Sequence, residues 1–322
     1  MSTTNKVNVI AEFCQNHNGD YEILSEMIHQ AAEAGATHAK VQTIFADELA
    51  FREPFEDGLV RDGKTIAIKR PYRAEYDRLK KLELDYDQQA RFIEDCRAAG
   101  MEPLTTCFTR GQVEPLSRLG WREVKVASYD CGSLPLLRDL AARFDHLIIS
   151  TGATHDHEIE GASQLLRSLG ASFTFLHCVT IYPTPLTQMH LKRLDYLKQL
   201  SPSIGLSNHA HVRDGVKPDL VAIWLGATYV ERHFTVLAPD QTRDGPVSIT
   251  ADHVREIVRF GRMTREDQSE YLRLHVPECD VMMGSEHRDL SDQELLNRDY
   301  YRGRFATKRG DRVIYNWEDQ SV

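Results

Sequence analysis

Two lysines stand inside short apolar runs of this chain, Lys40 in "HAKVQT" and Lys125 in "EVKVAS". A lysine buried in an apolar strand is costly unless an anion lies beside it. Hydroxyl donors stand at the ends of similar runs, and these donors are Thr106, Ser128, Ser150 and Ser207. Together the two cations and the hydroxyls suit a ligand that carries a phosphate and a carboxylate. The alternative is that each lysine extends to the rim of the fold and holds no ligand.

A second set of residues has the chemistry of metal ligands. His209 ends the run "IGLSNH", and His233 ends "VERH" about one strand–helix unit further along. Neutral imidazoles beside Glu12 and Glu231 would suit a borderline divalent cation that keeps open positions for substrate. We expect Mn²⁺, with Mg²⁺ or Co²⁺ as alternatives. A lone histidine at a strand end is more often a hydrogen-bonded structural residue, so the prediction depends on the pair.

The first apolar run ends in a group of hydrogen-bonding side chains, "AEFCQNHNGD". This stretch is either an ordinary exit from a strand into a loop or one wall of a site. Further polar side chains follow the second and sixth apolar runs, and these are Gln42, Thr180 and Tyr182. The cysteines near strand ends are interpreted as small hydrophobic residues, because nothing marks one as a nucleophile.

These residues can act together only in a fold that gathers strand ends. Short runs rich in β-branched residues predict strands at 7–13, 38–42, 102–106, 123–128, 146–151, 172–178, 203–209 and 228–234. Amphipathic stretches between them predict helices, for example at 21–35, 86–100, 133–144, 157–170 and 186–200. Strict alternation predicts a parallel sheet, and eight such units predict a (β/α)8 barrel with its site at the C-terminal strand ends. A doubly wound open sheet is the alternative, but no glycine-rich phosphate fingerprint follows the first strand.

Two segments interrupt this repeat. Residues 44–85 form a long insertion after the second strand, which is either functional or partly helical. Its basic cluster at 68–81 is interpreted as a solvated helix face. We predict that the barrel spans 1–263 and that 264–322 is a short C-terminal extension packed outside it.

The length, net charge and composition of the chain argue against several classes of protein. With 322 residues the chain can bury a large core, and its net charge of −9 disfavours a nucleic-acid binder that uses a general positive field. The sequence has no apolar run of transmembrane length, and "MSTTNK" has no signal-peptide core. The six cysteines are scattered, which favours reduced thiols in a cytoplasmic protein.

The motifs "AEFCQNHNGD", "KVQT", "KVASYD", "ISTGAT", "LHCVTIYPTP", "IGLSNHA" and "VERHFT" occur in this order. Over residues 10–263 the chain thereby resembles the sialic acid synthase family. The resemblance implies a homodimeric (β/α)8 barrel that joins phosphoenolpyruvate to the aldehyde of an open-chain N-acylated sugar. Phosphate leaves by C–O cleavage, and the product is a sialic-acid-like α-keto acid. Neither nucleic acid nor membrane is expected as a partner.

The resemblance also implies roles for individual residues. Lys40, Thr106, Lys125, Ser128, Ser150 and Ser207 match residues that hold phosphoenolpyruvate, and His209 and His233 match the metal ligands. Glu12, Gln42, Thr180, Tyr182 and Asp244 match positions around the sugar and the reacting carbons, and Glu231 matches a carboxylate near the attacking water. Residues 12–18 would then form the sugar-side wall, with Glu12 as its most consequential residue.

The chain departs from the family pattern in three places. Thr180 stands on the sugar side where the family often has an asparagine. Asn208 stands where the family usually has an aspartate, which removes a carboxylate beside a metal ligand. The last residues resemble only the entry to the family's antifreeze-like domain, which supplies an arginine to the sugar of the partner subunit. Arg302 or Arg304 is the expected substitute. A metal-dependent aldolase that releases no phosphate, or a decayed synthase that acts as a binding or regulatory protein, stays open as an alternative.

Overall fold

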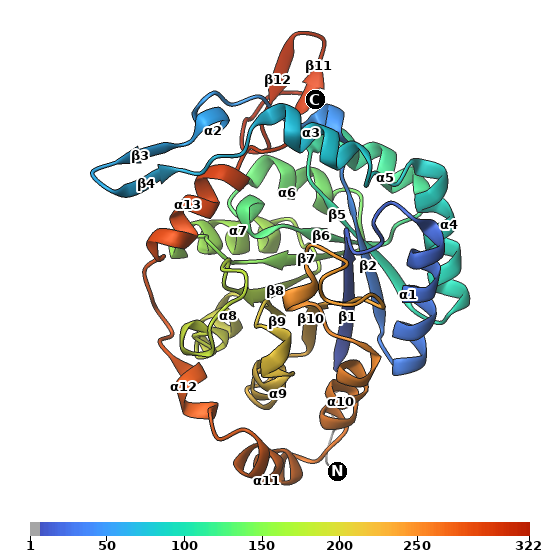
Figure 1. Cartoon of the computed structure of the whole chain (residues 1–322), viewed down its shortest axis with the longest axis vertical. Helices are drawn as coiled ribbons and strands as arrows, with labels where there is room; N and C mark the ends of the chain where they lie inside the picture. The colour runs from blue at the N-terminus through green and yellow to red at the C-terminus, as the bar shows by residue number, and fades with distance from the viewer. Residues whose placement is uncertain (1–6) are drawn as a thin grey trace.

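Eight parallel strands form a closed barrel in this computed structural model, which describes residues 7–322 (Figure 1). The strands are β1 (Asn8–Cys14), β2 (His38–Thr43), β5 (Glu102–Cys107), β6 (Glu123–Val126), β7 (His146–Ser150), β8 (Phe173–Cys178), β9 (Ser203–Asn208) and β10 (Tyr229–His233). Going round the barrel their order is β1-β10-β9-β8-β7-β6-β5-β2, and β2 pairs with β1 to close it. The predicted (β/α)8 barrel is confirmed.

A helix follows every barrel strand and packs on the outside of the barrel (Figure 1). The helices are α1 (Tyr21–Ala34), α4 (Tyr86–Ala98), α5 (Val113–Leu119), α6 (Leu134–Ala141), α7 (Asp156–Ser168), α8 (Arg193–Leu200), α9 (Lys217–Trp224) and α10 (Ala251–Gly261). Helix α1 ends at Gly35, whose φ of 92° is the left-handed conformation that closes a helix. The helix predicted at 186–200 is shorter, because a 3₁₀ turn precedes α8.

Strand boundaries differ from the prediction by one or two residues. The largest difference is at 123–128, where β6 ends at Val126 and Ser128 begins a 3₁₀ turn. The backbone thus leaves the barrel before Ser128, and the turn presents this hydroxyl to the space above the strands.

Side chains along each strand alternate between two sides of the barrel wall. One side faces the apolar layer beneath the helices, and the other faces the barrel interior. On β1, Phe13 packs outward against Phe92 of α4 and against Phe234. Ile10 points inward and meets Leu104, Ile148 and Leu176 of other strands. Because successive side chains of a strand point to opposite faces, the residue two positions after each inward apolar side chain also faces inward, closer to the mouth.

The insertion after β2 and the last part of the C-terminal segment, from residue 292 onward, lie at the same end of the molecule (Figure 1). The insertion contains a 3₁₀ turn, α2 (Pro54–Asp57), the hairpin β3 (Leu59–Arg61) and β4 (Lys64–Ala67), and α3 (Tyr72–Lys80). The C-terminal segment contains α11 (Arg265–His275), α12 (Cys279–Met283), α13 (Asp292–Tyr301) and the hairpin β11 (Thr307–Arg309) and β12 (Arg312–Ile314). The two segments are joined by ring packing of Phe55 on Tyr300 and by a backbone bridge between Leu49 and Phe305.

The expectation that 264–322 packs only outside the barrel needs correction. Helices α11 and α12 do lie outside it, but α13 and the residues that follow reach the mouth (Figure 1). There Asn297 donates to the Thr180 carbonyl at 2.7 Å, and Asn316 donates to the Phe108 carbonyl at 2.8 Å. The domain boundary at 263 stays a prediction.

Within residues 7–322 no helix is both long enough and apolar enough to cross a membrane. The residues used for the signal-peptide prediction, 1–6, lie outside the described residues.

The packed interior yields a first prediction. A Cβ added at Gly205 would come within 2.4 Å of the Tyr229 carbonyl oxygen and 2.5 Å of Leu176 Cδ2. We expect Gly205→Ala to lower the free energy of unfolding by about 1–3 kcal/mol, because overpacking forces the barrel apart. Urea denaturation measures this. In the control Gly161→Ala, on α7 with open space around it, the free energy should stay equal or rise by up to about 1 kcal/mol. Equal stability of both variants would contradict the prediction.

Candidate active site

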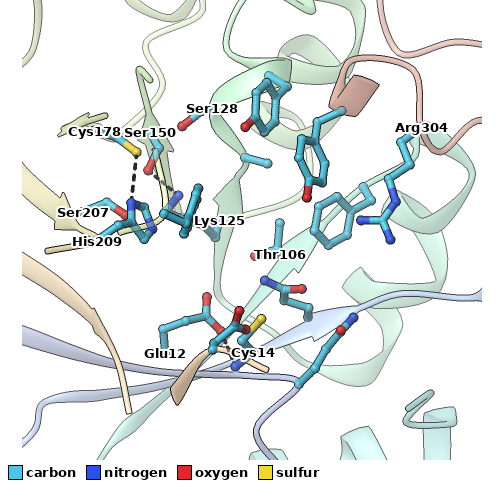
Figure 2. Close-up of a pocket in the computed structure, with 18 of the residues that line it drawn as sticks. Glu12, Cys14, Thr106, Lys125, Ser128, Ser150, Cys178, Ser207, His209 and Arg304 are labelled. Carbon is cyan, nitrogen blue, oxygen red and sulfur yellow. Dashed lines mark hydrogen bonds between the residues drawn. The ribbon is translucent and has the colours of Figure 1, made fainter. Parts of the chain in front are cut away.

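One cavity of about 510 Å³ lies at the C-terminal ends of the barrel strands (Figure 2). Of the site residues predicted from the sequence, all but Thr180 line it. Those that do are Glu12, Lys40, Gln42, Thr106, Lys125, Ser128, Ser150, Tyr182, Ser207, His209, Glu231, His233 and Asp244. The structure therefore brings these residues together, while their individual roles stay predictions.

Buried charges of both signs form the floor of the cavity. Lys40 forms ion pairs with Glu12 and with Glu231, the latter at 3.0 Å, and donates to Thr106 Oγ1 at 3.2 Å. Burial alone would lower the pKa of Lys40, but the two carboxylates outweigh it and raise that pKa above its usual range. The second oxygen of Glu12 accepts from the backbone N–H of Cys14 at 2.5 Å. Lys40 is therefore a fixed, fully charged cation.

The second lysine approaches the same carboxylate from another strand. Lys125 Nζ lies 3.6 Å from Glu231 Oε2 and donates to Ser150 Oγ at 2.6 Å (Figure 2). Burial opposes ionisation of Glu231, yet Lys125 and Lys40 outweigh it and hold its pKa below the usual range. Burial lowers the pKa of Lys125 despite this carboxylate. An anionic ligand would supply the negative charge that Lys125 lacks.

The two predicted metal ligands lie side by side at the mouth. The ring centroids of His209 and His233 are 5.4 Å apart. His209 Nδ1 lies 3.4 Å from the Val179 carbonyl oxygen, which leaves Nε2 free. Burial and the neighbouring His233 lower the pKa of His209 well below its usual value, so its imidazole is neutral. Among the described residues Nδ1 of His233 is buried without a hydrogen-bond partner. Two adjacent imidazole rings with free nitrogens fit a divalent cation.

The residues assigned to the sugar side differ in exposure and in whether they line the cavity. Tyr182 is 47% exposed at the mouth, with its ring 4.1 Å from that of His209. Thr180 is buried and does not line the cavity, contrary to the prediction. The reason is that Thr180 packs behind Gly152, where an added Cβ would touch Thr180 Cγ2 at 2.7 Å.

The expected wall at 12–18 also needs correction. Glu12, Cys14 and Gln15 line the cavity, but Asn16 and His17 do not. The side-chain amide of Asn16 donates to the Phe234 carbonyl at 2.8 Å and to a hydroxyl of the loop after β10. Burial lowers the pKa of His17 to about 4, so it is a neutral packing residue. Asn16 thus ties its own loop to the loop after β10, and His17 holds its own loop by accepting from the Gly19 N–H at 3.1 Å.

An arginine rim surrounds the outer cavity, and it consists of Arg70, Arg78, Arg243 and Arg304. Glu75 pairs with both Arg78 and Arg304, which joins α3 of the insertion to the C-terminal segment. The basic cluster at 68–81 is therefore more than a solvated face, since its inner side lines the cavity. Of the two arginines predicted to reach the sugar, Arg304 lines the cavity, and Arg302 instead pairs with Glu158 at 3.3 Å.

Sequence reasoning missed several lining residues. Tyr129 stacks on Tyr301 with centroids 5.0 Å apart, and both line the cavity. Asp130 is buried there, and burial raises its pKa to about 6 despite hydrogen bonds from Asn316 and Ser133. The position of Tyr129 and Asp130 directly after Ser128 was the available signal. For Tyr301 there was none, because its element lies far along the chain.

Asn208, which replaces the family's aspartate, faces away from the cavity. Its side-chain amide donates to both oxygens of Asp219 at 3.0 Å, and Arg232 pairs with Asp219 at 2.9 Å. A carboxylate at position 208 would face Asp219 directly. The Asn208 amide therefore completes a buried hydrogen-bond network outside the barrel wall. An amide in place of a carboxylate at this position leaves the charge of the cavity unchanged.

The buried floor gives a second prediction. Lys40→Met should lower the free energy of unfolding by about 3–5 kcal/mol, because Glu12 and Glu231 would lose the cation between them. Combining it with Glu12→Gln should recover part of this loss, since one uncompensated charge is removed. Urea denaturation of both variants measures the difference. A single variant as stable as the wild type would show that the ion cluster contributes nothing.

Comparisons with known proteins agree with this arrangement. The model of the NeuB family matches residues 27–271. The N,N′-diacetyllegionaminic acid synthase of Campylobacter jejuni is 32% identical over 253 residues, which cover 75% of this chain and 70% of that protein. A pseudaminic acid synthase of the same species is 26% identical over 309 residues, which cover 95% and 83%. Both relatives are therefore synthases of sugar acids.

The fold has a counterpart among solved structures. The N-acetylneuraminic acid (sialic acid) synthetase of Leptospira borgpetersenii, solved in complex with citrate, aligns with a TM-score of 0.70 at 24% identity. The alignment covers 92% of each chain, and at this identity it shows the shared fold.

Proposed function

The chain belongs to the NeuB family, and on that premise we propose that it condenses phosphoenolpyruvate with the aldehyde of an N-acylated sugar. The products are a nine-carbon α-keto acid and inorganic phosphate. The observation that carries this proposal is the buried floor, where two lysines from different strands flank one carboxylate and four hydroxyls lie around them. Such a floor suits a ligand with both a phosphate and a carboxylate.

In the proposed reaction the methylene carbon of phosphoenolpyruvate attacks the aldehyde carbon and forms the new C–C bond. Water adds to the former enol carbon, and the C–O bond to phosphate then breaks, so that phosphate leaves with the bridging oxygen. The aldehyde oxygen takes up a proton and becomes a hydroxyl. Lys40 and Lys125, already held by the strands, keep the phosphate and carboxylate in place throughout.

His209 and His233 would hold a divalent cation, and Mn²⁺ stays the expected ion. When bound, such an ion supplies Lewis-acid polarisation of the aldehyde oxygen. Tyr182 lies over the His209 ring and would shield that side of the cavity from water.

Glu231 is proposed to accept the proton of the attacking water. While both lysines face it, its pKa lies too low for a base. A bound phosphate would share the charge of the two lysines where they lie, and the pKa of Glu231 would rise as their effect on it weakens. The carboxylate thus gains basicity when the donor is in place. This coupling keeps the base inactive in the absence of the donor.

The arginine rim and Arg304 in particular are proposed to contact the acceptor sugar. Arg304 comes from the same chain as the barrel, and its guanidinium is held by Glu75 and lies 4.8 Å from the Phe305 ring centroid. The homodimer and the cytoplasmic location expected from the sequence stay predictions.

Removing the proposed base gives a third prediction. Glu231→Gln should lower turnover by about 100- to 10,000-fold, because the amide cannot take a proton from water. Phosphoenolpyruvate should still bind, and more tightly, because the lysines lose a competing anion. Isothermal titration and a phosphate-release assay separate the two effects. Glu123→Gln is the matched control, since Glu123 pairs with His38 at the opposite end of the barrel. Unchanged turnover in Glu231→Gln would reject this role.

The test of the function itself is phosphate release from phosphoenolpyruvate with Mn²⁺ and a panel of acceptors. The panel contains N-acylated hexosamines, their 2,4-diacetamido relatives and simple aldoses. We expect release that depends on one acceptor class and matches product formation one to one. Consumption of substrates without phosphate release would indicate an aldolase. Binding of phosphoenolpyruvate without turnover on any acceptor would indicate a binding or regulatory protein. Either result would overturn the proposal.

A further inference from the structure

Cys14 has a backbone conformation that a cysteine rarely adopts. Its φ is 48°, in the left-handed region where glycine is the favoured residue. The register between β1 and β2 shifts between Glu12 and Cys14, so that Cys14 follows an irregularity at the end of β1. A side chain held at such a position is strained, and strain of this kind concentrates at functional sites.

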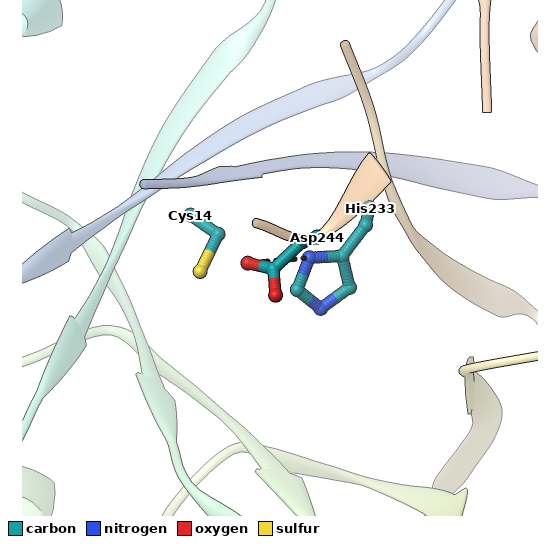
Figure 3. A group of neighbouring side chains, drawn as sticks. All are labelled: Cys14, His233 and Asp244. Carbon is teal, nitrogen blue, oxygen red and sulfur yellow. Dashed lines mark ion pairs between the residues drawn. The ribbon is translucent and has the colours of Figure 1, made fainter. Parts of the chain in front are cut away.

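The thiol lies beside two other groups that can bind metals (Figure 3). Ligand atoms of Cys14, His233 and Asp244 all lie within 4.8 Å of one another. Nδ1 of His233 is 3.7 Å from Asp244 Oδ2 and has no hydrogen-bond partner among residues 7–322. The His233 residue is only 8% exposed, and both it and Cys14 line the cavity. Within residues 7–322 this buried ring nitrogen has no hydrogen-bond partner, and together with the thiol and the carboxylate it offers three ligand atoms to one cation.

We propose that the divalent cation of this protein is bound by Cys14, His233 and Asp244 together, with Cys14 as a thiolate ligand. His209, the other histidine proposed to hold this cation, lies outside the compact group, but its ring lies next to that of His233 and faces the same cavity. Cys14 and Asp244 would therefore add to the two histidines as ligands of one cation at the mouth.

The sulfur ligand changes the class of ion that the site prefers. Oxygen-rich sites suit Mg²⁺ and Mn²⁺, whereas a thiolate favours softer or borderline ions such as Zn²⁺ and Co²⁺. Binding removes the thiol proton to solvent, as it does at other cysteine sites. The Mn²⁺ expected from the sequence would then be the weaker of the ions that bind.

One other interpretation of Cys14 fits less well. A cysteine that only fills space would not require a left-handed backbone, since glycine fits that conformation without strain.

Co²⁺ added to the metal-stripped full chain tests the inference directly. A thiolate bond to Co²⁺ gives a charge-transfer absorption band in the near ultraviolet, and we expect the wild type to show it. Cys14→Gly should lose the band and remain folded, because glycine adopts the left-handed conformation. Cys178→Ala should keep the band. Cys178 is the matched control, because it also lines the cavity and its sulfur lies 3.8 Å from His209 Nδ1.

Affinities give a second measurement. Loss of a true ligand should weaken Zn²⁺ binding by more than the roughly 10- to 100-fold seen when an orienting group is lost. Mn²⁺ binding should change far less. A wild type that binds Co²⁺ without the band, or a band that disappears in Cys178→Ala and persists in Cys14→Gly, would overturn the inference.

This metal site would serve the proposed synthase, so the inference rests on the proposed function. Its test, however, measures only the binding of metal ions. Phosphate release by a protein without the thiolate band would reject Cys14 as a ligand and leave the synthase intact. The band in a protein that releases no phosphate with any acceptor would support the site and reject the proposed reaction.

Discussion

Mutual compensation of buried charge is the constraint on which the cavity depends. Lys40, Lys125, Glu12 and Glu231 are each at most 5% exposed, and none of them could stay ionised alone in the interior of a barrel. Four of the strands each deliver one of these charges to the cavity floor, and ion pairs between them hold the charges in place. A floor of this kind needs little reorganisation when an anion arrives, because the cations are already oriented toward the cavity.

The mouth of the cavity is built by the two segments that interrupt the repeat. The insertion after β2 and the residues after α13 meet through Glu75 and Arg304, and aromatic rings of both segments pack around that contact. Neither segment could form the mouth alone, because Glu75 lies between arginines from both. The barrel thus supplies the floor of the cavity, and the two segments supply three of the four arginines of its rim. A change in these rim residues can therefore leave the strands undisturbed.

Asn208 illustrates how alternation along a strand separates stability from chemistry. Ser207 and His209 line the cavity, while the residue between them belongs to a buried network with Asp219 and Arg232 outside the wall. A change at such a position acts on the packing of α9 against the barrel. The absence of a carboxylate there has a structural reason and leaves the charge of the cavity unchanged.

The sequence by itself determined the barrel and identified the residues of the buried cavity floor. Periodicity predicted all eight strands to within two residues, and once the strands are parallel and closed, their C-terminal ends must converge. Lys40 and Lys125 could be identified because a charge in an apolar strand is costly and thus conspicuous. Only the tertiary structure decided that Thr180 lies behind the wall, that Asn16 and His17 secure a loop, and that Tyr301 and Arg304 reach the cavity. These outcomes depend on side-chain direction in irregular segments and on contacts between residues far apart in the chain, and neither leaves a periodic pattern in the sequence.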